Sequence, residues 1–421
     1  MCLAPSFWDN RHSPICRAFF QRAMVKAALI LAFDEKGLQP VFGVPAVRRL
    51  VLLLSGMGFE AVHVLGSKGS LWPKLSDLVS PGRFHDLGNS TRLNEVVKGL
   101  EFSGEDRILV LRGNHVVDRW SLAGFVRSAD VPGLLSLEAE GGGNGSGIFV
   151  VGKEKLADLV LALSSTDQGD RSTLPKGRAA AGGRGLPCLV GPGPESIGIA
   201  ESRLVAALAA ATAKTDGFMA RLFDRRLSRH VSRRIARTPM TPNTITLFNV
   251  ALGLVGAYLF SRGGYGAQVA GSIIFLLCVI LDGVDGEVAR LKLQETVFGR
   301  YLDIITDNIV HVALFVGLGL GVARQTGDER YLYVLCALLG GFACCALAMG
   351  RALRSGGNGI RSKTLDKLTG LLANRDFAYL LVVFALLNSL KWFLMSAAAG
   401  TYLFAAFVFF LDSRRSRLPS P

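Results

Sequence analysis

Long apolar segments in the second half of the chain constrain its fold more than any other feature of the sequence. Several of them approach the ~20 residues that a helix needs to cross a bilayer. Six such blocks follow Pro242: Thr244–Phe260, Ala267–Leu281, Ile304–Ala323, Tyr331–Ala348, Phe377–Leu390 and Trp392–Leu411. As helices of a soluble core they would have almost no polar faces, so they predict six transmembrane helices. Phe377–Leu390 is short and needs flanking turns to span.

Positive charge is unevenly distributed between the loops that join these blocks. One set of loops carries four Lys and Arg residues and the other set carries twelve. Loops rich in Lys and Arg stay in the cytoplasm, so both termini are predicted to be cytoplasmic and the helices to lie in the cytoplasmic membrane. The net charge of +14, in a chain that is 50% hydrophobic, then belongs to a cationic face against membrane lipid. No nucleic-acid partner is expected.

The first half of the chain alternates short β-like runs with helical ones. Strands are predicted at Val25–Phe33, Ala61–Leu65 and Arg107–Leu111, with a helix at Pro45–Met57. This alternation is typical of an α/β domain with a mainly parallel sheet, which we place at residues 24–200 and call the front domain. Residues 201–240 are predicted to form a juxtamembrane helix, and residues 241–412 an all-α transmembrane domain.

An arginine-rich segment, Lys214–Arg237, lies between the two halves. It holds eight basic residues and two acidic ones, and apolar residues interleave with them at near-helical spacing. The pattern indicates an amphipathic helix on the membrane surface. Two interpretations stay open: the arginines grip anionic lipid, or some of them hold a phosphate in a site.

Four aspartates stand close together in the membrane domain. Asp282 and Asp285 are three residues apart, and Asp303 and Asp307 are four apart, so each pair shares one helix face. A short turn between two antiparallel helices would bring all four to the cytoplasmic boundary. Four buried anions need cations to neutralise them, and oxygen-only ligands suit two Mg²⁺ or Mn²⁺ ions.

The residues between the two aspartate pairs suit a pyrophosphate bound by such ions. Gly286 and Ala289 have minimal side chains that let a ligand approach the helix, and Arg290 offers a fixed cation. A second hypothesis is a cation-coupled transporter that uses the intramembrane aspartates. The sequence shows no inverted repeat and no broken helix pair that would favour it.

This segment resembles the signature of the CDP-alcohol phosphotransferases (CDP-alcohol phosphatidyltransferases). Every signature position is filled: Asp282, Asp285, Gly286, Ala289, Arg290, Gly299, Asp303 and Asp307. The resemblance extends upstream to Thr241-Pro242-Asn243-Thr244-Ile245-Thr246. It implies a six-helix membrane enzyme, usually a homodimer, that transfers a phosphoryl-linked group from a CDP-alcohol to an acceptor hydroxyl and releases CMP.

The resemblance also implies roles for individual residues. The four aspartates would bind two divalent metal ions, and Asp307 would also be the catalytic general base. The residues that would contact the CDP moiety are Asn243, Thr246, Gly286, Ala289, Arg290 and Thr296.

The arginine-rich segment and the α/β domain before it resemble one branch of the family. These are the bifunctional inositol-phosphate cytidylyltransferase/di-inositol-phosphate-phosphate synthases, in which a nucleotidyltransferase domain makes the CDP-alcohol. The resemblance implies that Arg221 and Arg225 bind an acceptor phosphate. Donor and acceptor stay open, because CDP-inositol with inositol phosphate and CDP-diacylglycerol with a polyol phosphate fit the signature equally well. The resemblance implies a CDP-alcohol donor and an acceptor that is a polyol phosphate or a lipid.

The front domain departs from that branch at the residues that matter for nucleotidyl transfer. The first strand leads into Asp34-Glu35-Lys36-Gly37 without the glycine-rich phosphate loop, and Asn114 stands where a metal-binding Asp belongs. Asn is a poorer ligand than a carboxylate for a hard cation. We therefore expect a degenerate nucleotidyltransferase-like domain that does not transfer cytidylyl groups. We also expect a protein that begins near Lys214 to keep phosphotransferase activity.

Overall fold

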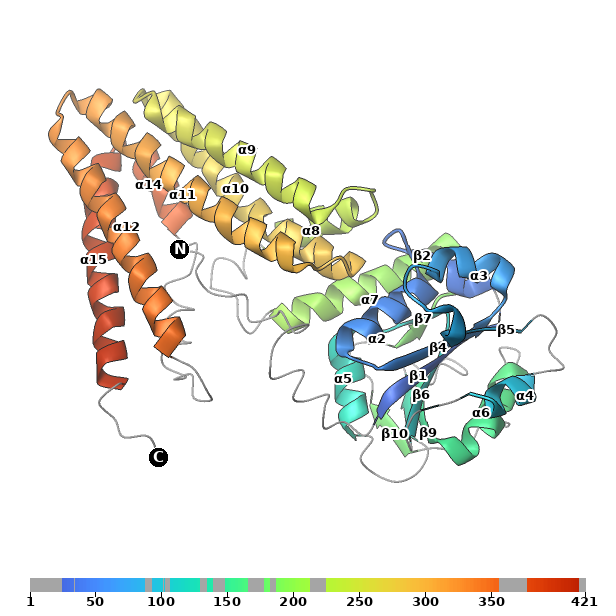
Figure 1. The fold of residues 1–421 in the computed structure, drawn as a ribbon. Helices are drawn as coiled ribbons and strands as arrows, with labels where there is room; N and C mark the ends of the chain where they lie inside the picture. The colour runs from blue at the N-terminus through green and yellow to red at the C-terminus, as the bar shows by residue number, and fades with distance from the viewer. Residues whose placement is uncertain are drawn as a thin grey trace.

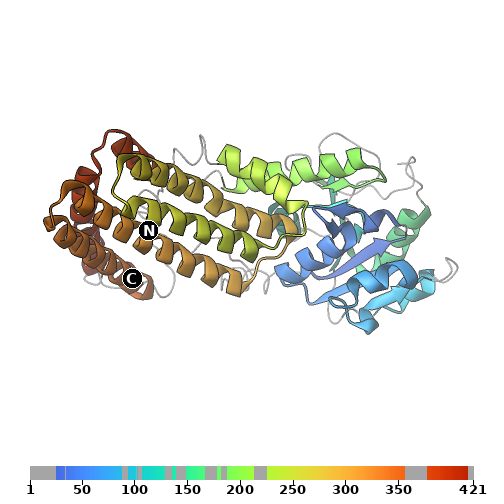
Figure 2. The same ribbon diagram turned by 90° about the horizontal axis from the view of Figure 1, so that it is seen from above.

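The computed structural model describes residues 25–33, 35–87, 93–100, 102, 107–128, 135–138, 148–165, 178–181, 187–212, 225–355 and 377–415. They form an α/β region and a helical region, which lie side by side (Figures 1 and 2). The α/β fold and its mostly parallel sheet confirm the prediction from the sequence.

The strands of the α/β region are β1 (Val25–Ala32), β2 (Pro40–Val41), β3 (Val44–Pro45), β4 (Ala61–Gly66), β5 (Phe84–Asp86), β6 (Arg107–Arg112), β7 (His115–Val116), β8 (Leu135–Glu138), β9 (Ile148–Gly152), β10 (Arg178–Ala181) and β11 (Cys188–Leu189). Seven of them form one sheet in the order β10-β8-β9-β6-β1-β4-β5, in which β9 alone is antiparallel to its neighbours. The helices are α2 (Ala46–Met57), α3 (Lys68–Leu75), α4 (Leu93–Lys98), α5 (Arg119–Ser128), α6 (Leu156–Ser165) and α7 (Pro194–Thr212). The last of these crosses the domain boundary predicted at residue 200.

Strand β1 lies in the middle of the sheet and is buried on both faces. Successive side chains of a strand point to opposite faces, so Ala28 and Ile30 pack with α2, α3 and α5. Leu29 and Leu31 pack with α4 and α6 on the other side. This explains why the segment reads as a continuous apolar run, as is usual for a central strand of a parallel sheet.

The helical region consists of α8 (Arg225–Ala236), α9 (Pro242–Ser261), α10 (Tyr265–Lys292), α11 (Val297–Thr326), α12 (Arg330–Ser355), α14 (Phe377–Leu386) and α15 (Leu390–Arg415). Among the described residues, five helices are long and apolar enough to cross a membrane, namely α9, α10, α11, α12 and α15. The fifth predicted block, Phe377–Leu390, corresponds to α14, which has only ten residues. At 1.5 Å per residue it is about 15 Å long, half the thickness of the hydrocarbon layer.

Helices α9 and α11 approach each other closely because α11 carries glycines at the contact. A Cβ atom added at Gly317 would overlap the carbonyl oxygen of Ala257, and one added at Gly321 would overlap that of Phe260. This four-residue spacing of small residues is a common way for membrane helices to bring their backbones into contact. It fixes the position of α11, and therefore of Asp303 and Asp307, relative to α9.

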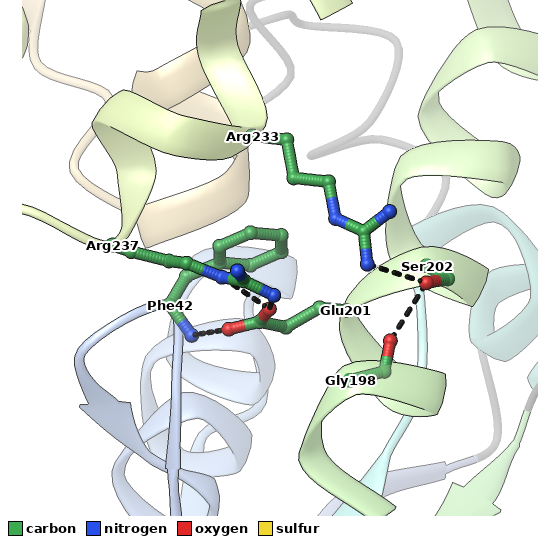
Figure 3. Close-up of polar contacts among 6 residues, drawn as sticks. All are labelled: Phe42, Gly198, Glu201, Ser202, Arg233 and Arg237. Carbon is green, nitrogen blue, oxygen red and sulfur yellow. Dashed lines mark hydrogen bonds and ion pairs between the residues drawn. The ribbon is translucent and has the colours of Figure 1, made fainter. Parts of the chain in front are cut away.

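The two regions meet in one apolar cluster, which we call the joint. Its buried members are Val41, Phe42, Val116, Cys188, Val190, Ala200, Leu204, Ala207, Leu208, Ala236, Ile245, Val284, Val288 and Leu291. Polar contacts border the joint: Arg237 binds Glu201 of α7 through Nε at 2.8 Å, and the backbone N–H of Phe42 donates to the same carboxylate at 3.1 Å (Figure 3). The joint ties the α/β sheet to the ends of α9 and α10.

Helix α8 covers part of the segment predicted to form an amphipathic surface helix. Its inner face packs on protein, because Ser228 and Ser232 are buried and donate to Glu287 of α10 at 3.1 and 2.7 Å. Arg233 donates to Ser202 of α7 at 2.8 Å (Figure 3). The helix is amphipathic as predicted, but its buried side contacts α7 and α10.

Candidate functional site

Helices α10 and α11 run antiparallel and are joined by a tight turn. α10 ends at Lys292 and α11 begins at Val297, so Arg290 and Lys292 belong to α10 and the turn between the helices is short, as predicted. Leu293 takes a left-handed conformation with φ 57°, and Thr296 is the N-cap that accepts a hydrogen bond from the Gly299 N–H at 2.9 Å. The turn sets the registration of the two aspartate pairs.

Three of the four aspartates converge. One carboxylate oxygen from each of Asp282, Asp303 and Asp307 lies within 4.8 Å of the other two, and all three residues are half-buried. A hard divalent cation prefers such a set of oxygen ligands, and the spacing leaves room for an ion between them. These residues therefore fit a Mg²⁺ or Mn²⁺ ion.

Asp285 is engaged differently. Its Oδ2 accepts a hydrogen bond from the Thr246 hydroxyl at 2.5 Å, and its Oδ1 accepts one from the Gly286 N–H at 2.6 Å. Both Asp285 and Thr246 are buried. Thr246, singled out as a CDP contact, thus orients a carboxylate of the same signature.

The other residues predicted to contact CDP gather around the same two helix ends. A Cβ atom at Gly286 would lie 3.4 Å from the Arg290 guanidinium, so the glycine makes room for that side chain. A Cβ atom at Gly299 would lie 3.0 Å from both Asn243 Oδ1 and Thr296 Oγ1. Asn243 of α9 and Thr296 therefore meet at the start of α11. Ala289 is half-buried on α10.

Two arginines are predicted to bind an acceptor phosphate. Arg221 lies outside the described residues, and Arg225 begins α8 but its side chain is not described. Of the basic residues that follow, Arg233 and Arg237 bind Ser202 and Glu201 of α7. The binding of an acceptor phosphate by Arg221 and Arg225 stays a prediction.

Residues of the front domain itself pack beyond the C-terminal ends of strands β1 and β6. Asn114 is buried, and its side-chain amide donates to the Val190 carbonyl at 3.0 Å. Gly37, which follows β1, packs so closely that an added Cβ would lie 3.2 Å from the Gly113 carbonyl oxygen. Within the described part of the front domain, no group of three or more His, Cys, Asp or Glu side chains lies close enough to share a metal ion.

Sequence reasoning missed three residues that hold the end of α10. Glu287 accepts from the two serines of α8, and Lys292 donates to the carbonyls of Thr238 and Met240 at 2.6 and 2.9 Å. Arg49 of α2 donates to the Leu291 carbonyl at 2.6 Å. The sequence held a local signal only for the partners of Glu287: Ser228 and Ser232 are four residues apart and so share one helix face.

Comparisons with known proteins agree on the C-terminal region. Residues 239–411 match the sequence model of the CDP-alcohol phosphatidyltransferase family. The bifunctional IPC transferase and DIPP synthase of Thermococcus kodakarensis is 36% identical over 147 residues, which cover 35% of this chain and 32% of that protein. The phosphatidylinositol phosphate synthase of Mycobacterium tuberculosis is 30% identical over 113 residues, which cover 27% of this chain and 51% of that one.

A solved structure also aligns with the chain. The crystal structure of the Mycobacterium tuberculosis phosphatidylinositol phosphate synthase with CDP-DAG bound is 25% identical in sequence, covers 44% of this chain and 94% of that chain, and superposes with a TM-score of 0.33. The chain thus spans about a third to a half of the length of the curated relatives named above.

Proposed function

Because residues 239–411 match the CDP-alcohol phosphatidyltransferase family model, we propose that the protein transfers a phosphoryl-linked alcohol from a CDP-alcohol to an acceptor hydroxyl and releases CMP. Proteins of this family are transferases that use CDP-alcohols. The observation that carries the proposal for this chain is the convergence of Asp282, Asp303 and Asp307 at the ends of two antiparallel helices. The family match gives no support to cation-coupled transport.

Asp282, Asp285, Asp303 and Asp307 would hold two Mg²⁺ or Mn²⁺ ions. Bound there, such ions neutralise a pyrophosphate and stabilise CMP as a leaving group. Asp307 acts as the general base and takes the proton of the attacking hydroxyl. Thr246 fixes the orientation of Asp285 through its hydroxyl hydrogen bond.

The residues at the helix ends would bind the donor. Arg290 supplies a cation for the phosphates, while Asn243, Thr296 and the backbone at Gly286 and Ala289 surround the nucleotide. Arg221 and Arg225 are proposed to bind the acceptor phosphate. The names of the relatives support a polyol-phosphate or phosphatidylinositol-type product.

The remaining architecture is proposed on the same premise. Residues 24–200 would be a degenerate nucleotidyltransferase-like domain, residues 201–240 the arginine-rich juxtamembrane segment, and residues 241–412 the phosphotransferase domain. α14 would take part in a sixth span, with both termini in the cytoplasm. A homodimer in the cytoplasmic membrane would be the working form.

The test is metal-dependent release of CMP by the full-length protein in detergent or proteoliposomes. CDP-inositol and CDP-diacylglycerol would each be offered with inositol phosphate, with Mg²⁺, Mn²⁺ or a chelator present. CMP formation with one pair and its loss on chelation is the expected result. Asp303→Asn should abolish it, while Glu329→Gln, an exposed carboxylate beyond the end of α11, should not. Failure to release CMP from either donor would refute the proposal.

Thr246 offers a finer test of how the site is held. We expect Thr246→Val to lower kcat/KM about 10- to 100-fold, because the buried Asp285 carboxylate loses the hydroxyl that orients it. Thr246→Ser keeps that hydroxyl and should stay near the wild type. Thr244→Val, an exposed threonine two residues away, is the matched control. Equal kinetics of Thr246→Val and Thr244→Val would contradict this role.

A further inference from the structure

The C-terminal end of α10 has two faces with different surroundings. Asp282, Gly286 and Ala289 are spaced at three and four residues and belong to the proposed site. Val284, Val288 and Leu291 have the same spacing on the opposite side and are buried in the joint. The helix that carries half of the site is therefore held from behind by the front domain and α8.

The C-terminal turn of α10 is bonded from outside the helix. The last carbonyls of a helix have no partner within it. The Leu293 N–H donates to the carbonyls of Ala289 and Arg290. The Leu291 carbonyl accepts a hydrogen bond from Arg49 Nη1 at 2.6 Å. That bond joins residues 242 positions apart in the chain. A shift at the Leu291 carbonyl would move Arg290 and the turn that leads to Thr296.

Arg49 is buried and charged at this contact. Its side chain is 7% exposed, and the same Nη1 also lies 3.3 Å from the Val41 carbonyl. Burial lowers the pKa of the Arg49 guanidinium to about 10, so the group stays charged at neutral pH. A charged donor makes a stronger bond to a carbonyl than a neutral one. Arg49 and Arg290 also line the same cavity between α2, α5, α7 and the α10–α11 turn.

The front domain contacts α10 through the edge of its sheet at which parallel α/β domains usually bind ligands. Parallel α/β sheets bind ligands at the C-terminal ends of their strands, where the strand order reverses. Here that point lies between β1 and β6, where Gly113 donates its N–H to the Leu31 carbonyl at 2.6 Å and packs against Gly37. The short strand pairs beyond it contribute Val41, Val116 and Cys188 to the joint. The ligand edge of the sheet thus faces the membrane region.

We propose that Arg49 is a positioning residue for phosphotransfer, and that the front domain fixes the C-terminal turn of α10 and with it Arg290. The inference rests on the proposed function. It also opposes the expectation that a protein beginning near Lys214 keeps phosphotransferase activity. Such a protein would lose Arg49 and expose Ile245, Val284 and Leu291.

The test compares full-length Arg49→Met and Arg49→Lys with Arg48→Met. Arg48 is the matched control, because its side chain binds the Asp77 carboxylate at 2.6 Å and the Lys74 carbonyl at 2.7 Å, both within the front domain. Three quantities are measured: the Mn²⁺ concentration that gives half of the maximal thermal stabilisation without substrate, amide hydrogen exchange over residues 293–296, and kcat and KM for CMP release.

For Arg49→Met we expect about a tenfold rise in the half-saturating Mn²⁺ concentration and at least about a tenfold fall in kcat/KM. Exchange over residues 293–296 should become faster while exchange in β1 and β6 stays unchanged. Arg49→Lys should lie between Arg49→Met and the wild type, and Arg48→Met should match the wild type.

Two different failures are distinguishable. If the wild type releases no CMP, the proposed function fails, but exchange over residues 293–296 still tests the contact. If Arg49→Met folds and matches Arg48→Met in all three quantities, this inference is overturned. If Arg49→Met does not fold, Arg49→Lys provides the test, because lysine lacks the planar guanidinium group of arginine. An Arg49→Lys variant with the amide exchange and the Mn²⁺ response of the wild type would overturn the proposal.

Discussion

Asp307→Asn should lower the turnover of CMP release by about 10²–10⁴-fold, because the amide keeps the shape of the side chain but cannot accept the proton of the attacking hydroxyl. The measurement is kcat at saturating donor and metal. Donor binding should survive better in this variant than in Asp282→Asn or Asp285→Asn. Folding should be preserved, because Asp307 is half-buried and its backbone carbonyl, which contacts His311 Nδ1 at 2.7 Å, is unchanged.

The comparison with Asp282→Asn separates the two roles proposed for these aspartates. A residue that only binds metal should show a defect that higher Mn²⁺ partly restores. A missing general base should not be restored by metal. Near-normal turnover of Asp307→Asn at any metal concentration would show that another group takes the proton.

The second large effect concerns folding. Gly317→Ala combined with Gly321→Ala should prevent the native packing of α9 on α11, because each new methyl group would overlap a backbone carbonyl of α9. Backbone atoms cannot move aside as a side chain can, so each change should cost at least about 3 kcal/mol, the upper end of ordinary overpacking. The expected result is little monodisperse protein in detergent and a collapse of the melting temperature.

Gly266→Ala is the matched control. It lies in the first turn of α10, and an added Cβ there would meet nothing within 4 Å. Alanine is also the better helix former, so this variant should be as stable as the wild type or slightly more stable. If the double variant purified and melted like Gly266→Ala, the close approach of α9 and α11 would be refuted.

The sequence located the site better than it located the site's support. Asp303 and Asp307 could be paired from their four-residue spacing, and a short turn between two antiparallel helices predicted that Asp282 would join them. Strand β1 and helix α2 could likewise be predicted from local pattern. The bond from Arg49 to Leu291 had no local signal, since it depends on how two distant elements pack.

Other features escaped for related reasons. The arginines of α8 gave a membrane-surface pattern, but the same amphipathic spacing also suits a helix that buries Ser228 and Ser232 against Glu287. Thr296 matched a family position, and only the structure shows that its hydroxyl also caps α11. Asp285 belonged to the signature, yet its bond to Thr246 joins two helices and could not be predicted from spacing.

The joint also has a consequence for the order in which the protein is made. Chains are synthesised from the N-terminus, and domains generally fold as units in that order. Phe42, Arg49 and Leu204 leave the ribosome before α9 and α10, so the surface that contacts Leu291 would be able to form before α10 is synthesised. An α10 inserted in the opposite direction would place Val284 and Leu291 on the wrong side of the bilayer from this surface. A front domain that folds first would therefore favour one orientation of the helix that carries Asp282 and Arg290.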